Sequence, residues 1–241
     1  MKITSDETVA RIAVECPAAV RVFERRRIDY CCSGDRPLQQ ACEAGGLDIV
    51  TILEEIEQER VATDNRHASR WDESPLDELV DHILEAFHQP LRQDLPRLVS
   101  MAHKVANAHR DKEPKMLPEV LSTVLGLQAE LEDHMAKEEQ VLFPMIKQGC
   151  GWMADGPISV MHQEHDSAAA ALARLRELTA QYRPHPKACP TWKALWAGLA
   201  ALEESLHQHI HLENNILFPR ALGSRSTSQA AGVPGPPVGV S

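Results

Sequence analysis

The sequence predicts an all-α protein: an up-down-up-down bundle of four long helices, preceded by a small domain of short helices. Ala, Leu, Glu and Arg fill long stretches of the 241 residues, runs of β-branched residues are scarce, and only 4% of residues are aromatic. That composition favours helix over sheet. Four segments of about 25 to 30 residues with short connections are typical of an antiparallel bundle. We therefore expect a soluble protein of one or two domains.

Residues 1–60 are predicted to form four short helices. An Asp side chain can accept the free N–H groups of a first turn, and proline fits the first helical position. The expected helices run from Asp6 to Glu15, onward from Pro17, from Asp35 to Cys42, and from Asp48 to Arg60. Each is too short to be stable alone, so the four must pack together. The polar, unpatterned residues 61–74 predict a linker.

Residues 75–222 are predicted to hold the four long helices. These run from Ser74-Pro75 to about Lys104, from Pro118 to Phe143, from Gly156-Pro157 to about Tyr182, and from Pro190 to the residue before Pro219. Pro90 and Pro96 predict a kink or break in the first helix, because proline removes a backbone hydrogen bond. The second helix is likewise expected to end before Pro144. The composition of residues 223–241 predicts a disordered tail.

One phrase occurs twice, as HMAKEEQVLFP beginning at His134 and as HIHLENNILFP beginning at His209. Glu138 follows the first histidine by four residues, and Glu213 follows the second in the same way. Residues four apart lie on one face of a helix, so each copy presents an imidazole and a carboxylate together. The Leu-Phe-Pro endings are expected to seal and terminate the helices.

Two further histidines are expected at the same level of the bundle. At roughly 1.5 Å per residue, the two repeat histidines lie about 15 Å before the ends of their helices. The first and third helices run the opposite way, and His88 and His165 lie near the starts of these helices, at about the matching depth. Asp81 and Glu85 share a stripe with His88 and are expected to accept hydrogen bonds from a ligand's N–H.

Four imidazoles and two carboxylates at one level of a core predict a metal centre. Left unpaired, these groups would cost several kcal/mol. They are too many for one small cation, and nitrogen and oxygen donors without a nearby cysteine favour iron or manganese over a thiolate zinc site. We expect the carboxylates to bridge two metals. The order His-x-x-x-Glu differs from the Glu-x-x-His of ferritin-like bundles.

Other histidines leave alternatives open. A single His-x-x-x-Glu is usually an exposed helix pair. His207 and His211 point about 200° away from His209 on a helix, so we expect them to face solvent. His162 lies one turn before His165 and is an extra ligand, a hydrogen-bond partner of a ligand, or a rim residue. His109 could fold back as a fifth ligand.

Two adjacent cysteines, Cys31 and Cys32, lie in the stretch IDYCCSGD between two short helices. Adjacent cysteines bond to each other only through a strained ring, so a structural disulfide is not expected. A helix beginning near Asp35 could lower a thiol pKa through its dipole. Such thiols could take part in redox exchange, accept a metal or join another chain; the alternative is two packed cysteines at a turn. The other four cysteines are interpreted as structural.

Several classes of protein are disfavoured. No apolar run approaches the roughly 20 residues that span a bilayer, and the N-terminal residues lack the apolar core of a signal peptide. We therefore expect a cytoplasmic protein that does not bind membranes. A net charge of -10, with no basic cluster beyond residues 25–27, argues against nucleic-acid binding.

The sequence resembles the repair-of-iron-centres family, also called the ScdA or di-iron iron-sulfur cluster repair proteins. That family joins an ScdA-type N-terminal domain, with an Asp-Tyr-Cys-Cys motif, to a hemerythrin-like bundle. The matching stretches are DYCCSG (29–34), DHILEAFH (81–88), HMAKEEQVLFPMIKQG (134–149), GPISVM followed by EHD (156–166), TWKAL (191–195) and HIHLENNILFPRAL (209–222). The resemblance covers nearly everything from residue 5 to residue 222.

The resemblance implies a non-haem, carboxylate-bridged centre of two iron ions. The implied ligands are His88, His134, His165 and His209, with Glu138 and Glu213 as bridges, and the family pattern adds a histidine at the position of His109. Two departures bear on this: Ser33 replaces a glycine of the usual Cys-Cys-Gly-Gly, and Pro90 follows His88 by two residues, which puts the position of that ligand in doubt.

By the same resemblance, the protein restores iron-sulfur clusters damaged by nitric oxide or oxidants, by donating iron rather than as a turnover enzyme. Cys31 and Cys32 are the candidate catalytic residues of this transfer, the partners are damaged or apo iron-sulfur proteins, and a homodimer is compatible with the sequence. One alternative is a binder or sensor of nitric oxide or dioxygen. Another is an enzyme that couples two nitric oxide molecules, which would need an external electron donor because no flavin or nicotinamide motif is present.

Overall fold

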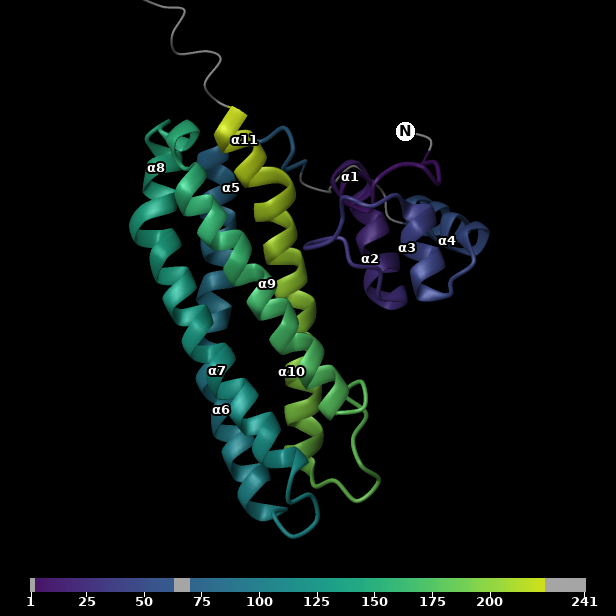
Figure 1. Ribbon diagram of the computed structural model, residues 1–241, viewed down its shortest axis with the longest axis vertical. Coiled ribbons are helices and arrows are strands. Elements are labelled where there is room, and N and C mark those ends of the chain that lie inside the picture. The colour runs from purple at the N-terminus through teal and green to yellow at the C-terminus, as the bar shows by residue number, and fades with distance from the viewer. Residues whose placement is uncertain (1–2, 63–69, 224–241) are drawn as a thin grey trace, which may run out of the picture.

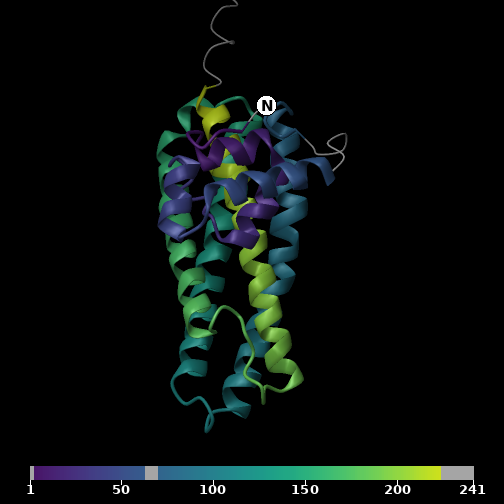
Figure 2. The ribbon, with the colours of Figure 1, turned by 90° about the vertical axis from the view of Figure 1, so that its right-hand side faces the viewer.

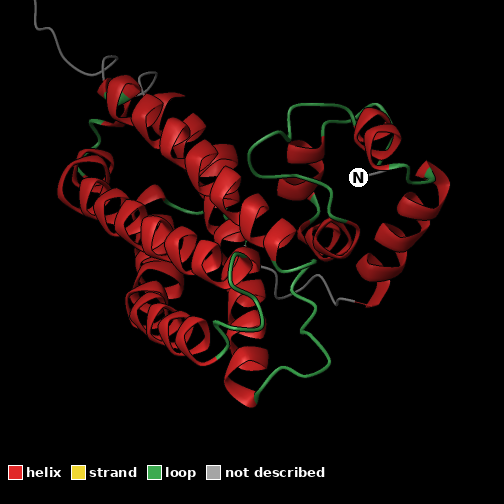
Figure 3. Ribbon diagram, turned by 60° about the horizontal axis from the view of Figure 1, so that its bottom comes forward, coloured by secondary structure: helices red, strands yellow, loops and turns green. Residues whose placement is uncertain are grey.

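The computed structural model describes residues 3–62 and 70–223, which form helices and no named strand (Figure 3). The elements are α1 (Val9–Glu15), α2 (Pro17–Arg26), α3 (Leu38–Gly45), α4 (Ile49–Ala62), α5 (Leu76–Ile83), η1 (Leu84–His88), α6 (Gln89–Ala108), α7 (Met116–Lys137), η2 (Glu138–Leu142), α8 (Phe143–Lys147), η3 (Gly151–Met153), α9 (Asp155–Leu178), α10 (Pro190–Leu212), η4 (Glu213–Leu217) and α11 (Phe218–Gly223). The all-α prediction is confirmed.

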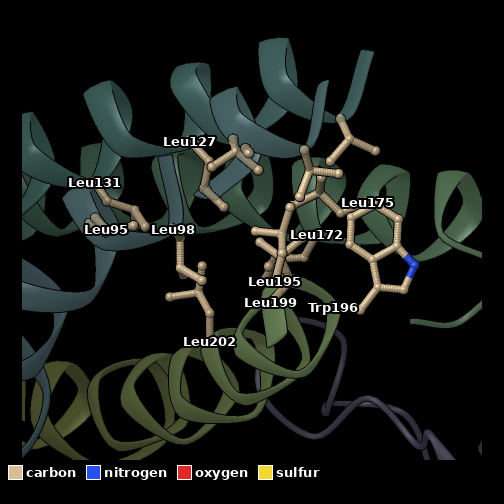
Figure 4. Close-up of a cluster of buried hydrophobic side chains, with 14 of the residues drawn as sticks. Leu95, Leu98, Leu127, Leu131, Leu172, Leu175, Leu195, Trp196, Leu199 and Leu202 are labelled. Carbon is tan, nitrogen blue, oxygen red and sulfur yellow. The ribbon is translucent and has the colours of Figure 1, made fainter. Parts of the chain in front are cut away.

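Four antiparallel rods form the bundle (Figure 1). They are α5–η1–α6, α7–η2–α8, α9 and α10–η4–α11. Leucines from every rod interlock in the core, among them Leu98, Leu127, Leu172 and Leu199 (Figure 4). Gly198 of α10 faces Leu98 so closely that an added Cβ would lie 2.6 Å from its Cδ2, so glycine allows these two rods to approach. The predicted up-down-up-down bundle is thus confirmed.

Three prolines lie within continuous helical rods, whereas the sequence predicted a kink or break at Pro90 and helix ends before Pro144 and Pro219. Pro90, Pro144 and Pro219 each occupy the second residue of a helix that directly follows a five-residue π-helical segment. Each π segment closes with an i→i−5 hydrogen bond; in η2, for example, Phe143 N–H donates to the Glu138 carbonyl. This wider turn places proline at the start of a new helical stretch, where it tolerates its missing N–H. The predicted stops before Pro144 and Pro219 are wrong.

A separate core holds α1 to α4 together, with Val22, Phe23 and Ile52 buried in it. Ile210 of α10 belongs to the same core, so this N-terminal domain packs directly on the fourth rod. Figure 2 shows it lying across the bundle over α9 and α10. It covers a face of α10 that a lone bundle would leave to solvent.

Local capping differs from expectation in two places. Thr8, not Asp6, caps α1, and its hydroxyl accepts from Arg11 N–H. The third helix begins at Leu38 after Pro37 rather than near Asp35. Asp48 behaves as predicted and accepts the Thr51 N–H at 2.9 Å.

Residues 63–69 of the predicted linker and residues 224–241 of the predicted tail lie outside the described residues, and the first two linker residues belong to α4. The described end of the linker is folded: Arg220 donates to the carbonyls of Trp71 and Ser74, and Trp71 stacks on His82 with ring centroids 4.3 Å apart. No helix among residues 3–62 and 70–223 is long and apolar enough to cross a membrane.

Candidate metal centre

Six buried side chains meet in one half of the bundle. This half ends in α8 and α11 (Figure 1). The six are His88 at the end of η1, His134 in α7, His165 in α9, His209 in α10, and Glu138 and Glu213, the first residues of η2 and η4. None is more than 3% exposed. We call these residues the histidine–glutamate cluster. All four rods contribute to it.

Two overlapping donor sets make up the cluster, and within each set the donor atoms lie within 4.8 Å of one another. One set adds His88 and His209 to the two glutamates, and the other adds His134 and His165. Both glutamates belong to both sets. The geometry therefore offers two adjacent four-donor positions that share two carboxylates.

Each carboxylate reaches one histidine of each pair. The distances are Glu138 Oε2 to His88 Nε2 3.3 Å and to His134 Nε2 3.4 Å, Glu213 Oε1 to His209 Nε2 2.9 Å, and Glu213 Oε2 to His165 Nε2 3.1 Å. This is the placement required of a bridging carboxylate.

Three of the histidines are oriented from outside the cluster through Nδ1. The pairs are His88 with Glu139 Oε1 at 2.8 Å, His134 with Glu164 Oε2 at 2.9 Å, and His165 with Asn214 Oδ1 at 2.8 Å. Since all three partners are acceptors, each ring carries a proton on Nδ1 and turns its Nε2 toward the cluster.

The cluster fits cations and is poorly satisfied without them. Nε2 of His134 and Nε2 of His165 lie 3.2 Å apart, so without a cation a proton must lie between them. Both carboxylate oxygens of Glu138 are buried with no hydrogen-bond partner. Isolated buried carboxylates are costly, whereas a cation between these atoms would satisfy the oxygens and the lone pairs together.

The electrostatics of the residues alone point the same way. Burial, reinforced by the charge of Glu213, raises the pKa of Glu138. Burial also opposes ionisation of Glu213, but His209 and His165 outweigh it and hold its pKa well below the usual range. Burial lowers the pKa of His165, yet its hydrogen bond to Glu213 and the charges of Glu213 and Glu138 together outweigh this and raise it to about 9. Protons on Glu138 and His165 therefore supply part of the positive charge that bound cations would otherwise supply.

The two Leu-Phe-Pro endings seal the cluster. The ring of Phe143 lies against His88, with centroids 5.6 Å apart, and the ring of Phe218 stacks on His165 at 6.1 Å. In each repeat, the phenylalanine ring thus packs on the histidine that the residue after the shared glutamate orients. This histidine is His88 for the first copy and His165 for the second.

Two cavities of different character flank the cluster. One, of about 190 Å³, reaches His134, His165 and His209 and is lined by the carboxylates of Glu130, Asp133 and Glu164, of which the last two share an ion pair with Lys137. The other, of about 610 Å³, reaches His88 and is lined by Arg92 and Lys147 together with Glu139. With its lysine counted, the first cavity keeps an excess of negative charge, whereas in the second Arg92 pairs with Glu139 and Lys147 pairs with Asp81, so cations are favoured more in the first cavity than in the second.

The structure does not bring His109 into the cluster. It ends α6 at the opposite end of the bundle, where its Nε2 lies 3.2 Å from Cys189 Sγ and its ring packs on Trp192. From Trp192 to His209 is about 25 Å along α10, at 1.5 Å per residue. The helix runs straight past the cluster instead of folding back.

Four other expectations need correction. Asp81 pairs with Lys147, and Glu85 is exposed, so the acceptor for His88 is Glu139 instead. His211 is buried rather than exposed: its Nδ1 accepts from Asn215, and burial lowers its pKa to about 4.

His207 is also covered by the N-terminal domain, and its Nδ1 lies 3.6 Å from Glu24 Oε2. The sequence reasoning did not anticipate that this domain packs on the face of α10 that carries His207 and His211. His162 stands at the rim, with its ring edge against Phe218, and belongs to neither donor set.

The Cys31–Cys32 loop packs against η4, beside the cluster. Asn214 Nδ2 donates to the Cys31 carbonyl at 3.1 Å, and Asn215 Nδ2 donates to the Tyr30 carbonyl at 2.9 Å. Because α3 begins only at Leu38, no helix dipole acts directly on the thiols. Their pKa values diverge for another reason: a hydrogen bond between the two sulfurs lowers the pKa of Cys32 and raises that of Cys31.

The departure at Ser33 does not distort this loop. Ser33 is exposed and hydrogen-bonds to Asp29. Burial raises the pKa of that carboxyl, but the hydrogen bonds from Cys32, Ser33 and Cys31 together outweigh it and lower the pKa. The tight position is Gly34, where an added Cβ would lie 2.7 Å from the Tyr30 carbonyl oxygen.

Sequence reasoning missed the residues that orient the histidines. Glu139 and Asn214 occupy the same position in the two copies of the repeat, directly after the shared glutamate, and Glu164 directly precedes His165. The repeat itself held this signal, because both copies place a side chain with a hydrogen-bond acceptor directly after the shared glutamate.

Comparison with known proteins identifies two domains. A model of the hemerythrin HHE cation-binding domain matches residues 79–221, and a model named ScdA_N, a domain of unknown function, matches residues 5–60. The iron-sulfur cluster repair protein YtfE of Citrobacter koseri is 42% identical over 219 residues, which covers 90% of this chain and 97% of the relative. YtfE of Escherichia coli is 42% identical over 222 residues, with the same coverage.

Proposed function

This chain belongs to the hemerythrin HHE cation-binding family and to the family of iron-sulfur cluster repair proteins, and on that premise we propose that it repairs damaged iron-sulfur clusters by donating iron. Its clients would be apo or damaged iron-sulfur proteins, including those attacked by nitric oxide or oxidants. Iron is then cargo as well as a bound ion, so the centre must both hold it and let it go.

We propose that two iron ions occupy the histidine–glutamate cluster, one at each four-donor position, with Glu138 and Glu213 as bridges. Imidazole nitrogen and carboxylate oxygen are donors that iron accepts. The observation that carries this assignment is Glu138, a fully buried carboxylate with no hydrogen-bond donor at either oxygen, placed between two histidine pairs.

The acidic cavity supports donation over permanent storage. Glu130, Asp133 and Glu164 line it and outnumber Lys137, the one lysine that pairs with two of them, and the cavity reaches the His134–His165 pair. In the cavity beside His88, the two cationic side chains are each paired with a carboxylate. A divalent cation is therefore favoured along the acidic route. We infer that the ion held by His134 and His165 leaves first.

The test is transfer itself. Iron-loaded protein is mixed anaerobically with an apo iron-sulfur protein and sulfide, and cluster recovery is followed by visible absorption alongside the iron left on the donor. We expect recovery to rise as donor iron falls. Glu138→Gln should bind little iron and repair little, while Glu132→Gln, an exposed carboxylate on the same rod, should match wild type. Equal recovery with Glu138→Gln would contradict the proposal.

Reversible binding of nitric oxide or dioxygen is a second candidate function. The small cavity beside the cluster also has an apolar wall of Leu131, Ala168 and Leu206, which suits passage of a diatomic gas. This function predicts that iron stays bound throughout the transfer assay, that gas binding is reversible, and that replacing Cys31 and Cys32 changes neither result. Loss of iron to the acceptor would decide against it.

A further inference from the structure

A second group of metal-binding side chains lies in the N-terminal domain, outside the histidine–glutamate cluster. We propose that Cys31 and Cys32, together with Asp29, form a second metal site, for one thiophilic divalent cation. The proposal rests on the proposed function only in naming ferrous iron as the cation that the site would hold in the cell.

The geometry of the two sulfurs suits a single ion. Cys31 Sγ and Cys32 Sγ lie 3.4 Å apart. Two thiolates bound at about 2.3 Å to one tetrahedral cation stand roughly 3.8 Å apart, so closing on the ion needs a shift of only about 0.4 Å. An oxygen of Asp29 and both sulfurs lie within 4.8 Å of one another, which supplies a third donor.

Asp29 is held beside the sulfurs by the backbone that carries them. Its Oδ1 accepts the N–H of Cys31 at 3.2 Å and the N–H of Cys32 at 3.0 Å. Ser33 also hydrogen-bonds to this carboxylate, and the Cys31 thiol lies 3.6 Å from the same Oδ1. A cation that replaces the thiol proton would therefore meet this oxygen without moving Asp29 out of the loop. The donors are therefore preorganised, and binding does not need to fold a disordered segment.

The sulfurs are reachable from outside. A cavity of about 490 Å³ between the N-terminal domain and the α9–α10 face of the bundle is lined by both cysteines. Its walls carry Glu24, Glu203 and Glu204, and also arginines, of which Arg176 is neutralised by Glu203 at 2.9 Å. Cys32 is the more exposed of the two thiols.

The site is connected to one half of the histidine–glutamate cluster. Asn214 accepts the Nδ1–H of His165 and donates to the Cys31 carbonyl, so a single side chain touches both the cluster and the loop. The equivalent residue of the other repeat, Glu139, makes no contact with the N-terminal domain among the described residues. The second site thus adjoins the His134–His165 position, which flanks the acidic cavity.

Cobalt titration of the iron-loaded full chain tests the site under anaerobic, reducing conditions. Co²⁺ bound to thiolates gives a sulfur-to-metal charge-transfer band in the near ultraviolet, which histidine and carboxylate ligands do not give. We expect the band to saturate at one cobalt per chain and to vanish in Cys31→Ala/Cys32→Ala. Asp29→Asn preserves the backbone acceptor but removes the charge, and should weaken cobalt binding by roughly tenfold or more.

Cys150→Ala and Cys189→Ala are the matched controls. Both remove a partly exposed cysteine, and Cys189 lies beside His109, so each controls for metal binding at an unrelated thiol. A band that persists in Cys31→Ala/Cys32→Ala, or that disappears in either control, would overturn the proposal. Failure of wild type to repair clusters would overturn the proposed function but leave the cobalt result intact, because the titration does not depend on repair.

Discussion

The two copies of the repeated phrase place the same side chains around one centre, yet they face different surroundings. In the first copy, Met135 packs in the bundle core, and Glu139 pairs with a surface arginine. In the second, Ile210 packs into the core of the N-terminal domain, and Asn214 donates to the loop that carries the two cysteines.

The difference shows how one motif can serve two purposes. Both copies need an acceptor that fixes the proton of a neighbouring histidine, and a carboxylate or an amide oxygen supplies it equally well. A carboxylate can only accept, whereas an amide can also donate. The amide of Asn214 therefore joins the centre to a second domain, while the carboxylate of Glu139 ends at the surface.

The largest effect is expected where the copies are equivalent. Glu138→Gln and Glu213→Gln each remove one shared carboxylate charge from both donor sets. We expect each change to weaken iron binding by at least about a hundredfold, because even residues that merely orient ligands contribute 10- to 100-fold. Iron per chain after dialysis, with circular dichroism to confirm folding, measures this. Variants that keep two irons would show that the glutamates are not bridges.

The second-largest effect is expected at the residue directly after each repeat histidine, where the two copies pack in different cores. Met135→Ala and Ile210→Ala each leave a cavity, and we expect each change to lower the free energy of unfolding of the part it packs in by about 2–5 kcal/mol. Met135→Ala should lower the stability of the bundle in urea denaturation, while Ile210→Ala should mainly release the N-terminal domain and speed alkylation of Cys32. If both variants weakened the bundle equally and left Cys32 unchanged, the two copies would not differ in this way.

A finer contrast is available at the residue after each shared glutamate. Asn214→Asp keeps the acceptor for His165 but cannot donate to the Cys31 carbonyl, which should weaken docking by about 1–3 kcal/mol. We expect full iron content with faster alkylation of Cys32, measured by mass spectrometry. Glu139→Gln serves as the comparison and should leave the alkylation rate as in wild type; the reverse pattern would assign the link to the other copy.

The smallest effect is expected at the surface of the first copy. Arg92 is about half exposed and pairs with Glu139 at 3.0 Å. Exposed ion pairs contribute little, so Arg92→Gln should cost less than about 1 kcal/mol in thermal or urea unfolding and should not change iron content. A loss of iron in this variant would mean that the arginine orients His88 through Glu139.

Sequence reasoning could predict the bundle and its histidine level because both depend on helical periodicity and depth. His88, His134, His165 and His209 meet where a rise of 1.5 Å per residue places them. It could not locate His109, since a loop histidine has no fixed depth. It also mistook the prolines for stops, because a π turn depends on how a rod packs and has no simple periodic signal.

Features that depend on the N-terminal domain were the hardest to predict. A helical wheel correctly turns His207 and His211 away from the centre, but it cannot show that a second domain covers that face. The docking of Asn214 and Asn215 on the cysteine loop is likewise a tertiary contact between residues more than 180 positions apart. No local pattern encodes such a pairing.

The central claim is that Glu138 and Glu213 bridge two cations. Anomalous diffraction at the iron edge from crystals of the iron-loaded protein tests it most directly. We predict two peaks about 3.5 Å apart, as in other paired-metal sites, each bonded to an oxygen of both glutamates and to its own histidine pair. A single peak, or two peaks that share neither carboxylate, would contradict the account.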